Sequence, residues 1–145
     1  ETKPNFKDFI LHNEKWYIYK GSKSAFKPNK NTIYREVLKV NGVPVAYIEL
    51  DKIKDMDRAV DVCIACKRYN KYRHKGYSSN LVARALEWAK INKDIDYVMW
   101  ATGKINKQSI GLARKMGFKD SPGHILNPEE ETYLKYWVEF KYDVR

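Results

Sequence analysis

Six consecutive residues, Arg73 to Ser78, combine the side chains and the backbone freedom that suit a phosphate group. They stand where a β-rich segment passes into a helical one, and a helix start leaves N–H groups unpaired at the positive end of its dipole. Gly76 allows those donors to converge, and the small Ser78 lets an anion come close. Arg73 and Lys75 add positive charge. The run therefore predicts a pyrophosphate cradle, and the alternative is an ordinary strand-to-helix turn with surface cations.

The run matches neither the GxGxxG dinucleotide pattern nor the P-loop pattern that ends in GK[ST], which disfavours a dehydrogenase or a nucleotide hydrolase. The cysteines also carry little signal. Cys63 and Cys66 have CxxC spacing, but they fall in a run that reads as a strand, so they should point to opposite faces. The three histidines are far apart: His12, His74 and His124. We expect buried core thiols and no metal.

The chain has 145 residues, of which 43% are hydrophobic, so one domain over residues 1–145 is expected. Lys and Arg number 28 against 18 Asp and Glu, a net charge of +10 that attracts nucleic acid, an acidic membrane or a phosphorylated cofactor. The positive residues are scattered, which also fits a plain basic surface. No run approaches the ~18 apolar residues of a membrane span, and no signal peptide opens the chain, so a cytoplasmic protein without a membrane partner is expected.

The elements that would position the cradle are read from turn signals and periodicity. Ile33–Val40 and Val43–Leu50 are β-rich runs joined by Asn41-Gly42, which suits a tight hairpin because both residues need positive φ. Asp51–Asp57 is expected to be a loop and Ala59–Lys67 a third strand. Before the hairpin we expect a short helix, a strand and a loop, over Phe6–His12, Trp16–Lys20 and Gly21–Asn31.

After the cradle, Ser78–Ile91 repeats apolar residues at helical spacing, and Tyr97–Ala101 reads as a short strand. Asn106 can cap a second helix that runs to about Met116, and Gly117 is placed to end it. The last segments expected are a turn at Pro122-Gly123 and an aromatic strand over Tyr133–Tyr142. This order predicts a mixed sheet packed with helices, in the α/β or α+β class.

The sequence resembles the GCN5-related N-acetyltransferase (GNAT) family at two motifs. The first, [R/Q]xxGx[G/A] at a helix start, corresponds to Arg73, Gly76 and Ser78. The second, NxxAxxxYxxxGF after a strand, corresponds to Asn106, Ser109, Ala113, Gly117 and Phe118. The resemblance covers Ile33–Phe118, and residues 1–31 form an atypical N-terminal segment. It implies a mostly antiparallel sheet with one splayed parallel pair of strands, flanked by helices.

By this resemblance the protein would bind acetyl-coenzyme A, as co-substrate, between two splayed strands, Ala59–Lys67 and Tyr97–Ala101. The pantetheine arm would pair with backbone groups near Ala65, Cys66 and Lys67. The pyrophosphate would lie on the phosphate loop, formed by Arg73, His74, Lys75, Gly76, Tyr77 and Ser78. Asn106 would contact the arm and Phe118 would pack nearby, and the alternatives for these two are a helix cap and a core aromatic.

The resemblance also implies direct attack of an amine on the thioester, which needs a base because an aliphatic amine has a pKa of about 10.4. Asp61 and Glu49 are the candidate bases, and the alternative for each is an ion-paired or edge residue facing solvent. The family's acid is the Tyr of the second motif, which is Ala113 here. Either the thiolate leaves unaided, or Ser109 or a distant tyrosine substitutes, or the protein binds coenzyme A without catalysis.

The leading hypothesis is therefore an N-acetyltransferase that moves an acetyl group to a primary amine of a small molecule or a protein. One alternative is a catalytically silent domain of the same fold that binds a cofactor or a partner. Another is a nucleic-acid-associated protein, motivated by the +10 charge and eleven tyrosines, although no recognition motif is visible. The acceptor is not identified, because acceptor pockets are built largely from loops. The aromatic last strand could form a homodimer seam or lie in the core.

Overall fold

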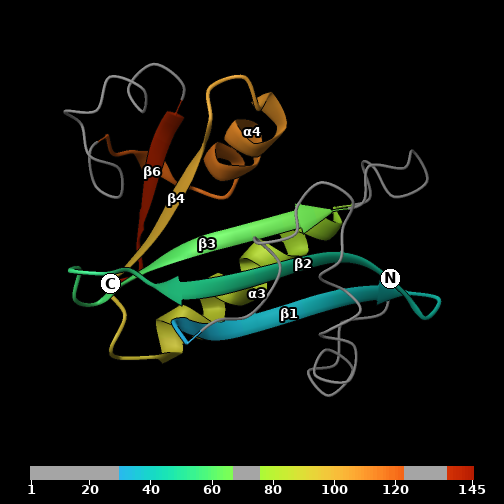
Figure 1. The fold of residues 1–145 in the computed structure, drawn as a ribbon, viewed down its shortest axis with the longest axis horizontal. Helices are drawn as coiled ribbons and strands as arrows, with labels where there is room; N and C mark the ends of the chain where they lie inside the picture. Colours follow the sequence, from blue (N-terminus) through green and yellow to red (C-terminus); the bar gives the residue numbers. More distant parts are fainter. Residues whose placement is uncertain (1–29, 67–75, 123–136) are drawn as a thin grey trace.

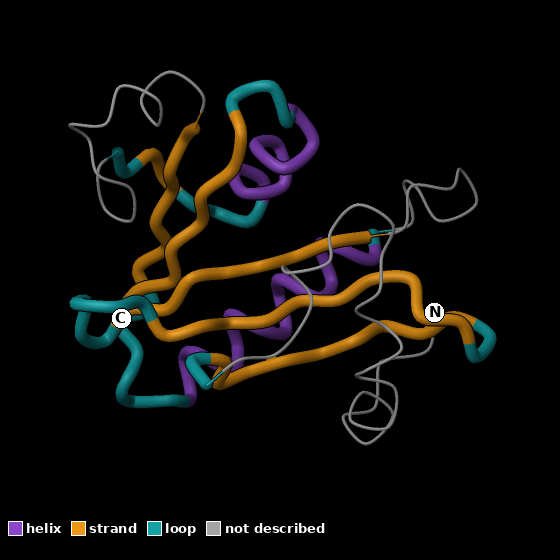
Figure 2. Tube along the Cα trace, in the orientation of Figure 1, coloured by secondary structure: helices purple, strands orange, loops and turns teal. Residues whose placement is uncertain are grey.

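The computed structural model describes residues 30–66, 76–122 and 137–145 (Figures 1 and 2). Its elements, in chain order, are β1 (Thr32–Val40), β2 (Val43–Lys52), β3 (Ala59–Cys66), α3 (Tyr77–Ile91), β4 (Tyr97–Gly103), α4 (Lys107–Lys115), β5 (Lys119–Asp120) and β6 (Trp137–Asp143). The helix and the strand expected in the first 20 residues lie outside the described residues, as do the expected loop up to residue 29 and the first residues of the expected last strand.

The strands form one mixed sheet in the order β1-β2-β3-β4-β6-β5. Every neighbouring pair is antiparallel except β3 and β4, which run parallel. A parallel connection needs a long crossover, and α3 lies in the crossover between these two strands. The predicted fold class, a mostly antiparallel sheet with one parallel pair and flanking helices, is confirmed.

The hairpin between β1 and β2 forms at the predicted dipeptide. Asn41 and Gly42 have φ values of 50° and 77°, the left-handed conformation that a two-residue hairpin turn requires. The loop was expected over Asp51–Asp57, and its start was placed too early. β2 continues through Lys52, and its last residues still pair with β3. Asp51 is therefore a strand residue that stands opposite Asp61, and this correction matters for the site.

Helix α3 covers one face of the β1–β3 half of the sheet (Figure 1). Its predicted apolar stripe is buried, namely Leu81, Val82, Ala85, Leu86 and Ala89. The stripe shares a hydrophobic cluster with Ala46, Ile48 and Leu50 of β2 and with Val60 and Val62 of β3. Each buried Leu, Ile or Val contributes about 1.5–3 kcal/mol. Because strand side chains alternate, the odd-numbered residues from Tyr47 onward in β2 and throughout β3 project from the opposite face.

Helix α4 has the predicted ends. The Asn106 side chain accepts a hydrogen bond from the backbone N–H of Ser109 at 3.1 Å, which caps the helix start. At the other end Gly117 has a φ of 92°, and its N–H bonds the carbonyl of Arg114 while the Phe118 N–H bonds that of Ala113. These two bonds form a Schellman motif. Within the part of the chain that is described, no helix has both the length and the apolarity to cross a membrane.

Candidate active site

The two parallel strands separate soon after they meet. β3 and β4 pair only through Ala59–Asp61 and Tyr97–Met99. Beyond that point β3 stays paired with β2 as far as Cys66, and β4 stays paired with β6 as far as Gly103. Figure 1 shows β4 and β6 turning away from β3, with α4 on their side of the gap. The splayed pair that the family resemblance implied is therefore present, and it opens immediately after Asp61.

The edge of β3 that faces the gap carries backbone groups without a strand partner among the described residues. Ala65 and Cys66, where the pantetheine contact was predicted, lie on this stretch of β3 and pair with β2 on the other edge. Lys67, the third predicted residue, lies outside the described part of the chain, and so do Arg73, His74 and Lys75 of the phosphate loop. The roles of all these residues stay predictions.

The start of α3 has the backbone of an anion site. Gly76 precedes the helix with φ 74° and ψ 13°, a left-handed conformation that favours glycine. A β-carbon at this position would meet no heavy atom within 4 Å, so the requirement comes from the φ angle and not from crowding. The first helical bond runs from the Asn80 N–H to the Gly76 carbonyl at 3.0 Å. The earlier N–H groups have no intrahelical acceptor, no described side chain caps them, and the first turn has no acidic residue.

Tyr77 and Ser78, the other predicted loop residues that are described, differ in their surroundings. The Tyr77 side chain is buried in the hydrophobic core, so only its backbone is placed to meet a ligand. Ser78 is half-buried at the second helical position. A phosphate at this helix start would therefore be held by backbone donors and by the helix dipole, with little steric obstruction from the small side chain.

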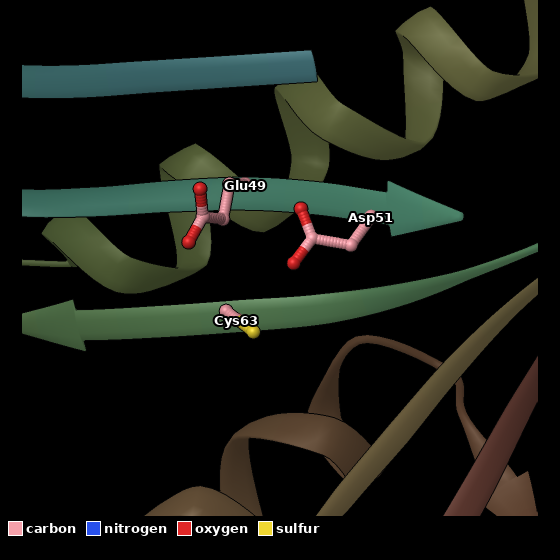
Figure 3. Close-up of side chains that lie close together, drawn as sticks. All are labelled: Glu49, Asp51 and Cys63. Atoms are coloured by element: carbon pink, nitrogen blue, oxygen red, sulfur yellow. The ribbon is translucent and has the colours of Figure 1, made fainter. Parts of the chain in front are cut away.

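Polar side chains gather on the sheet face opposite α3. Glu49 and Asp51 of β2 and Cys63 of β3 project to this side, in front of the sheet in Figure 3 with the helix behind it. Their ligand-type atoms all lie within 4.8 Å of one another. The strand register places Cys63 opposite Glu49 and Asp61 opposite Asp51. We call these four side chains the acidic face.

Glu49 is 1% exposed and forms an ion pair with Arg35 of β1, whose Nη1 lies 3.2 Å from Glu49 Oε2. Burial raises the pKa of Glu49 to about 7. The positive charge of Arg35 lowers this pKa, and the negative charge of Asp51 raises it by a smaller amount. The expectation of a solvent-facing residue is therefore wrong for Glu49, and the expectation of an ion pair is confirmed. The ion pair holds its carboxylate beside Arg35, which limits its freedom to reach an amine.

Asp61 is placed differently. Burial, followed by the charge of Asp51, raises its pKa to about 7, while a hydrogen bond with the Val62 backbone lowers it and Glu139 of β6 adds a smaller increase. Its Oδ1 is buried and has no hydrogen-bond partner among the described residues. Asp61 is the last β3 residue to pair with β4. A carboxyl group that changes protonation near neutral pH thus stands at the point where the gap opens.

Cys63 was expected to be a core thiol, and this expectation is wrong. The side chain is half-buried beside the carboxylates and does not belong to the hydrophobic cluster. Burial and the neighbouring charges of Asp61, Asp51 and Glu49 raise its pKa well above the usual range, so the thiol stays protonated and is a poor nucleophile. The expected absence of a metal stays a prediction, and the group of Glu49, Asp51 and Cys63 is where a cation would be sought.

The second motif is occupied largely by structural contacts. Ser109 Oγ accepts a hydrogen bond from the buried Trp100 indole at 3.0 Å, which ties α4 to β4. Phe118 packs edge-on against Trp100, with ring centroids 5.1 Å apart, so it is a core aromatic. Ala113 is fully buried. Among these residues the side-chain amide N–H groups of Asn106, which is exposed, remain compatible with a ligand contact.

Sequence reasoning missed Asp51, Arg35 and Glu139 as parts of this region. Asp51 was assigned to a loop, although its spacing of two from Glu49 would have placed both on one strand face. Arg35 and Glu139 reach the region only through strand pairing, β1 with β2 and β4 with β6. No local signal in the sequence identifies those neighbours.

Comparisons with known proteins agree with this geometry. A family model described as the acetyltransferase (GNAT) family matches residues 4–118. A GNAT acetyltransferase from Streptococcus pneumoniae has a similar structure, with a TM-score of 0.60 and 16% identity, covering 81% of this chain and 69% of its own. A search of curated protein sequences found no match.

Two further solved structures with a similar fold contain the acetyl donor. One is a putative streptothricin acetyltransferase from Bacillus anthracis in complex with acetyl coenzyme A, with a TM-score of 0.62, 19% identity and coverage of 81% of this chain and 65% of its own. The other is a putative acetyltransferase from Salmonella typhimurium with its cofactor acetyl-CoA, with a TM-score of 0.60, 16% identity and coverage of 77% and 64%. The chain thus spans about two thirds of these proteins, and at such identities the likeness shows the fold.

Proposed function

The chain belongs to the acetyltransferase (GNAT) family, and from this membership and the geometry of the site we propose that it transfers an acetyl group from acetyl-coenzyme A to a primary amine. The observation that carries the proposal is the gap between β3 and β4. The gap opens at the carboxyl group of Asp61, whose pKa is about 7. Along β3 it leads toward the start of α3, where the first N–H groups have no acceptor within the helix and no side-chain cap among the described residues.

The donor would be held at two places. The first-turn N–H groups of α3, behind the left-handed Gly76, would bind the pyrophosphate together with the cations of the phosphate loop. The unpaired edge of β3 near Ala65 and Cys66 would hydrogen-bond the pantetheine amides and polarise the thioester carbonyl through a backbone N–H. The absence of an acidic residue from the first turn of α3 supports an anion at this position.

Asp61 is the base that we propose, in preference to Glu49. An ammonium acceptor is attracted to the acidic face, where Asp51 and Glu139 add negative potential. Asp61 takes a proton from the ammonium, and the neutral amine attacks the carbonyl carbon. Glu49 is less suited because Arg35 already pairs with it. A pKa of about 7 leaves Asp61 partly ionised at neutral pH, so the rate should rise with pH through that value.

The leaving thiolate needs no dedicated acid in this proposal, since a thiol has a pKa of about 8.5 and leaves readily. Ala113, at the family's Tyr position, is fully buried and has no proton to give. Ser109 already accepts a bond from Trp100, although its hydroxyl hydrogen can still be donated elsewhere. The same Ala113 supports a second candidate function, a domain that binds coenzyme A without catalysis.

Two measurements test the proposal. Calorimetry with acetyl-coenzyme A and with coenzyme A, at two salt concentrations, should give micromolar binding of both with modest salt dependence. The Gly76→Asp variant should lose this binding, because it puts a side chain and a negative charge against the phosphate. Release of free thiol is then followed with a panel of amines, including polyamines, amino sugars, lysine and amino-terminal peptides.

Thiol release with any amine would exclude the non-catalytic candidate. Binding without turnover across the panel would favour that candidate. No binding by the wild-type protein would overturn the proposal, and oligonucleotides would become the next ligands to test because of the +10 charge.

A further inference from the structure

A lysine from α4 reaches the first turn of α3. Lys115, in the last turn of α4, donates a hydrogen bond from its Nζ to Ser79 Oγ at 3.2 Å, and the contact is exposed. Ser79 is the third residue of α3. Since α3 packs on β1–β3 and α4 on β4, this contact joins the two parts of the molecule that the splay separates.

The position of this ammonium is electrostatically unfavourable for α3 alone. The N-terminus of a helix carries a partial positive charge that attracts anions and repels cations. Natural helices commonly place an acidic residue in the first turn, but α3 has none there, and instead receives a cation from another element. An anion bound at this turn would offset the repulsion between the helix N-terminus and the ammonium, because it would interact favourably with both.

Arg114, the neighbouring cation of α4, has an acidic partner, whereas Lys115 has a neutral one. Arg114 approaches a carboxylate, with its Nη2 3.8 Å from Asp120 Oδ1, and its guanidinium also lies over the Phe140 ring. Among the described residues, Lys115 forms no ion pair, and the partner found for it is a neutral hydroxyl. A lysine in the last turn of α4 interacts favourably with the negative end of that helix dipole, whichever way the side chain points. This interaction does not explain an ammonium group at the start of α3.

We propose that Lys115, which stands at an unspecified position of the second motif, is an additional binding residue for the pyrophosphate of coenzyme A. The inference rests on the proposed function, since it needs the donor's phosphates at the start of α3. Lysine binds phosphate as a point charge. The hydrogen bond to Ser79 keeps the Lys115 ammonium group beside the first turn of α3, where the N–H groups would bind the same phosphate. Because Lys115 belongs to α4, phosphate binding would also draw α3 and α4 together across the splayed strands.

The test compares Lys115→Met, which keeps the length of the side chain and removes the charge, with Lys115→Arg and with the control Lys54→Met. Lys54 is exposed in the turn between β2 and β3, so the control makes the same charge change away from α3. Calorimetry measures the binding of coenzyme A and of dephospho-coenzyme A, which lacks the 3′-phosphate but keeps the pyrophosphate. Thermal unfolding without ligand checks that all variants fold.

Lys115→Met should bind both ligands about 10-fold more weakly than the wild type, with the difference shrinking at high salt. Lys115→Arg should recover most of the affinity, and Lys54→Met should bind as the wild type does. Equal affinities for Lys115→Met and the wild type would overturn the inference and leave the proposed function intact. A loss seen with coenzyme A but not with dephospho-coenzyme A would overturn it in favour of the 3′-phosphate. No binding by the wild type would overturn the proposed function and this inference together.

Discussion

Replacement of Asp61 by Asn should stabilise the folded protein at alkaline pH while it removes acetyl transfer. The pKa of Asp61 is raised from 3.8 to about 7 by burial first and by Asp51 second. A raised pKa means that the folded state holds the proton more tightly than the unfolded state. The favourable contribution is complete below about pH 4 and is lost as pH rises to about 7, where the folded protein must carry a buried charge.

The magnitude follows from the two pKa values. A difference of about three pH units at about 1.36 kcal/mol each gives an upper limit of about 4 kcal/mol for the cost of ionised Asp61. Part of the side chain remains exposed, and solvent screening reduces this cost, so about 2 kcal/mol is expected. Asn has nearly the same shape and carries no charge at any pH, so the variant should gain this amount at pH 8 and little or nothing near pH 4.

Urea unfolding of the wild type and of Asp61→Asn, between pH 4.5 and 8.5, measures the difference in unfolding free energy. Glu49→Gln is the matched control, since the pKa of Glu49 is also raised to about 7. In that variant the buried Arg35 loses its ionised partner, so a smaller gain or a net loss is expected. Thiol release by Asp61→Asn should fall about 100-fold or more with the best amine acceptor.

A stability difference between Asp61→Asn and the wild type that does not vary with pH would refute the assignment of a raised pKa. Full activity in a folded Asp61→Asn protein would refute its role as the base, whatever the stability result. The two readouts are separate, because the first depends only on the environment of Asp61 and the second on its contact with the amine.

Two other variants give sharp outcomes. Asp51→Asn should move the midpoint of the pH–rate profile to lower pH, because the charge of Asp51 helps to raise the pKa of Asp61, and the rate at pH 6 should rise about threefold; an unchanged or higher midpoint would contradict the coupling. Gly117→Ala should destabilise the protein by about 1–2 kcal/mol in thermal unfolding, because φ is 92° and the new β-carbon would lie 3.4 Å from the Tyr142 ring; unchanged stability would argue against the left-handed helix end.

The features predicted well from the sequence are those that neighbouring residues determine. The Asn41-Gly42 turn, the apolar stripe of α3, and the cap and terminator of α4 each depend on contacts within a few residues. The positive φ of Gly76 belongs to the same class, since a glycine before a helix predicts it locally. These features were enough to place the start of α3, whereas the splayed strands were expected from the family resemblance.

The acidic face could not be predicted to the same extent, because its composition depends on strand register. β2 is two residues longer than expected, and this extension turned Asp51 from a loop residue into the neighbour of Asp61. The half-buried environment of Cys63 and the ion pair of Glu49 with Arg35 also depend on which strands are adjacent. Local sequence carries little information about such non-local pairings, and β4 was likewise expected to end at Ala101 although it continues to Gly103.

The two candidate bases, Glu49 and Asp61, differ in whether the stability of the fold alone explains their presence. Glu49 has an explanation of that kind, because its buried charge is balanced by Arg35 on the adjacent strand. Asp61 has a second carboxylate, Asp51, opposite it, and among the described residues no cation balances its charge. Such an arrangement lowers stability at neutral pH, and hydrophobic residues of similar size would avoid the cost. Perturbed carboxyl groups of this kind concentrate at functional sites. The location of Asp61, at the last paired position before β3 and β4 separate, is where a base for an amine entering the gap would be needed.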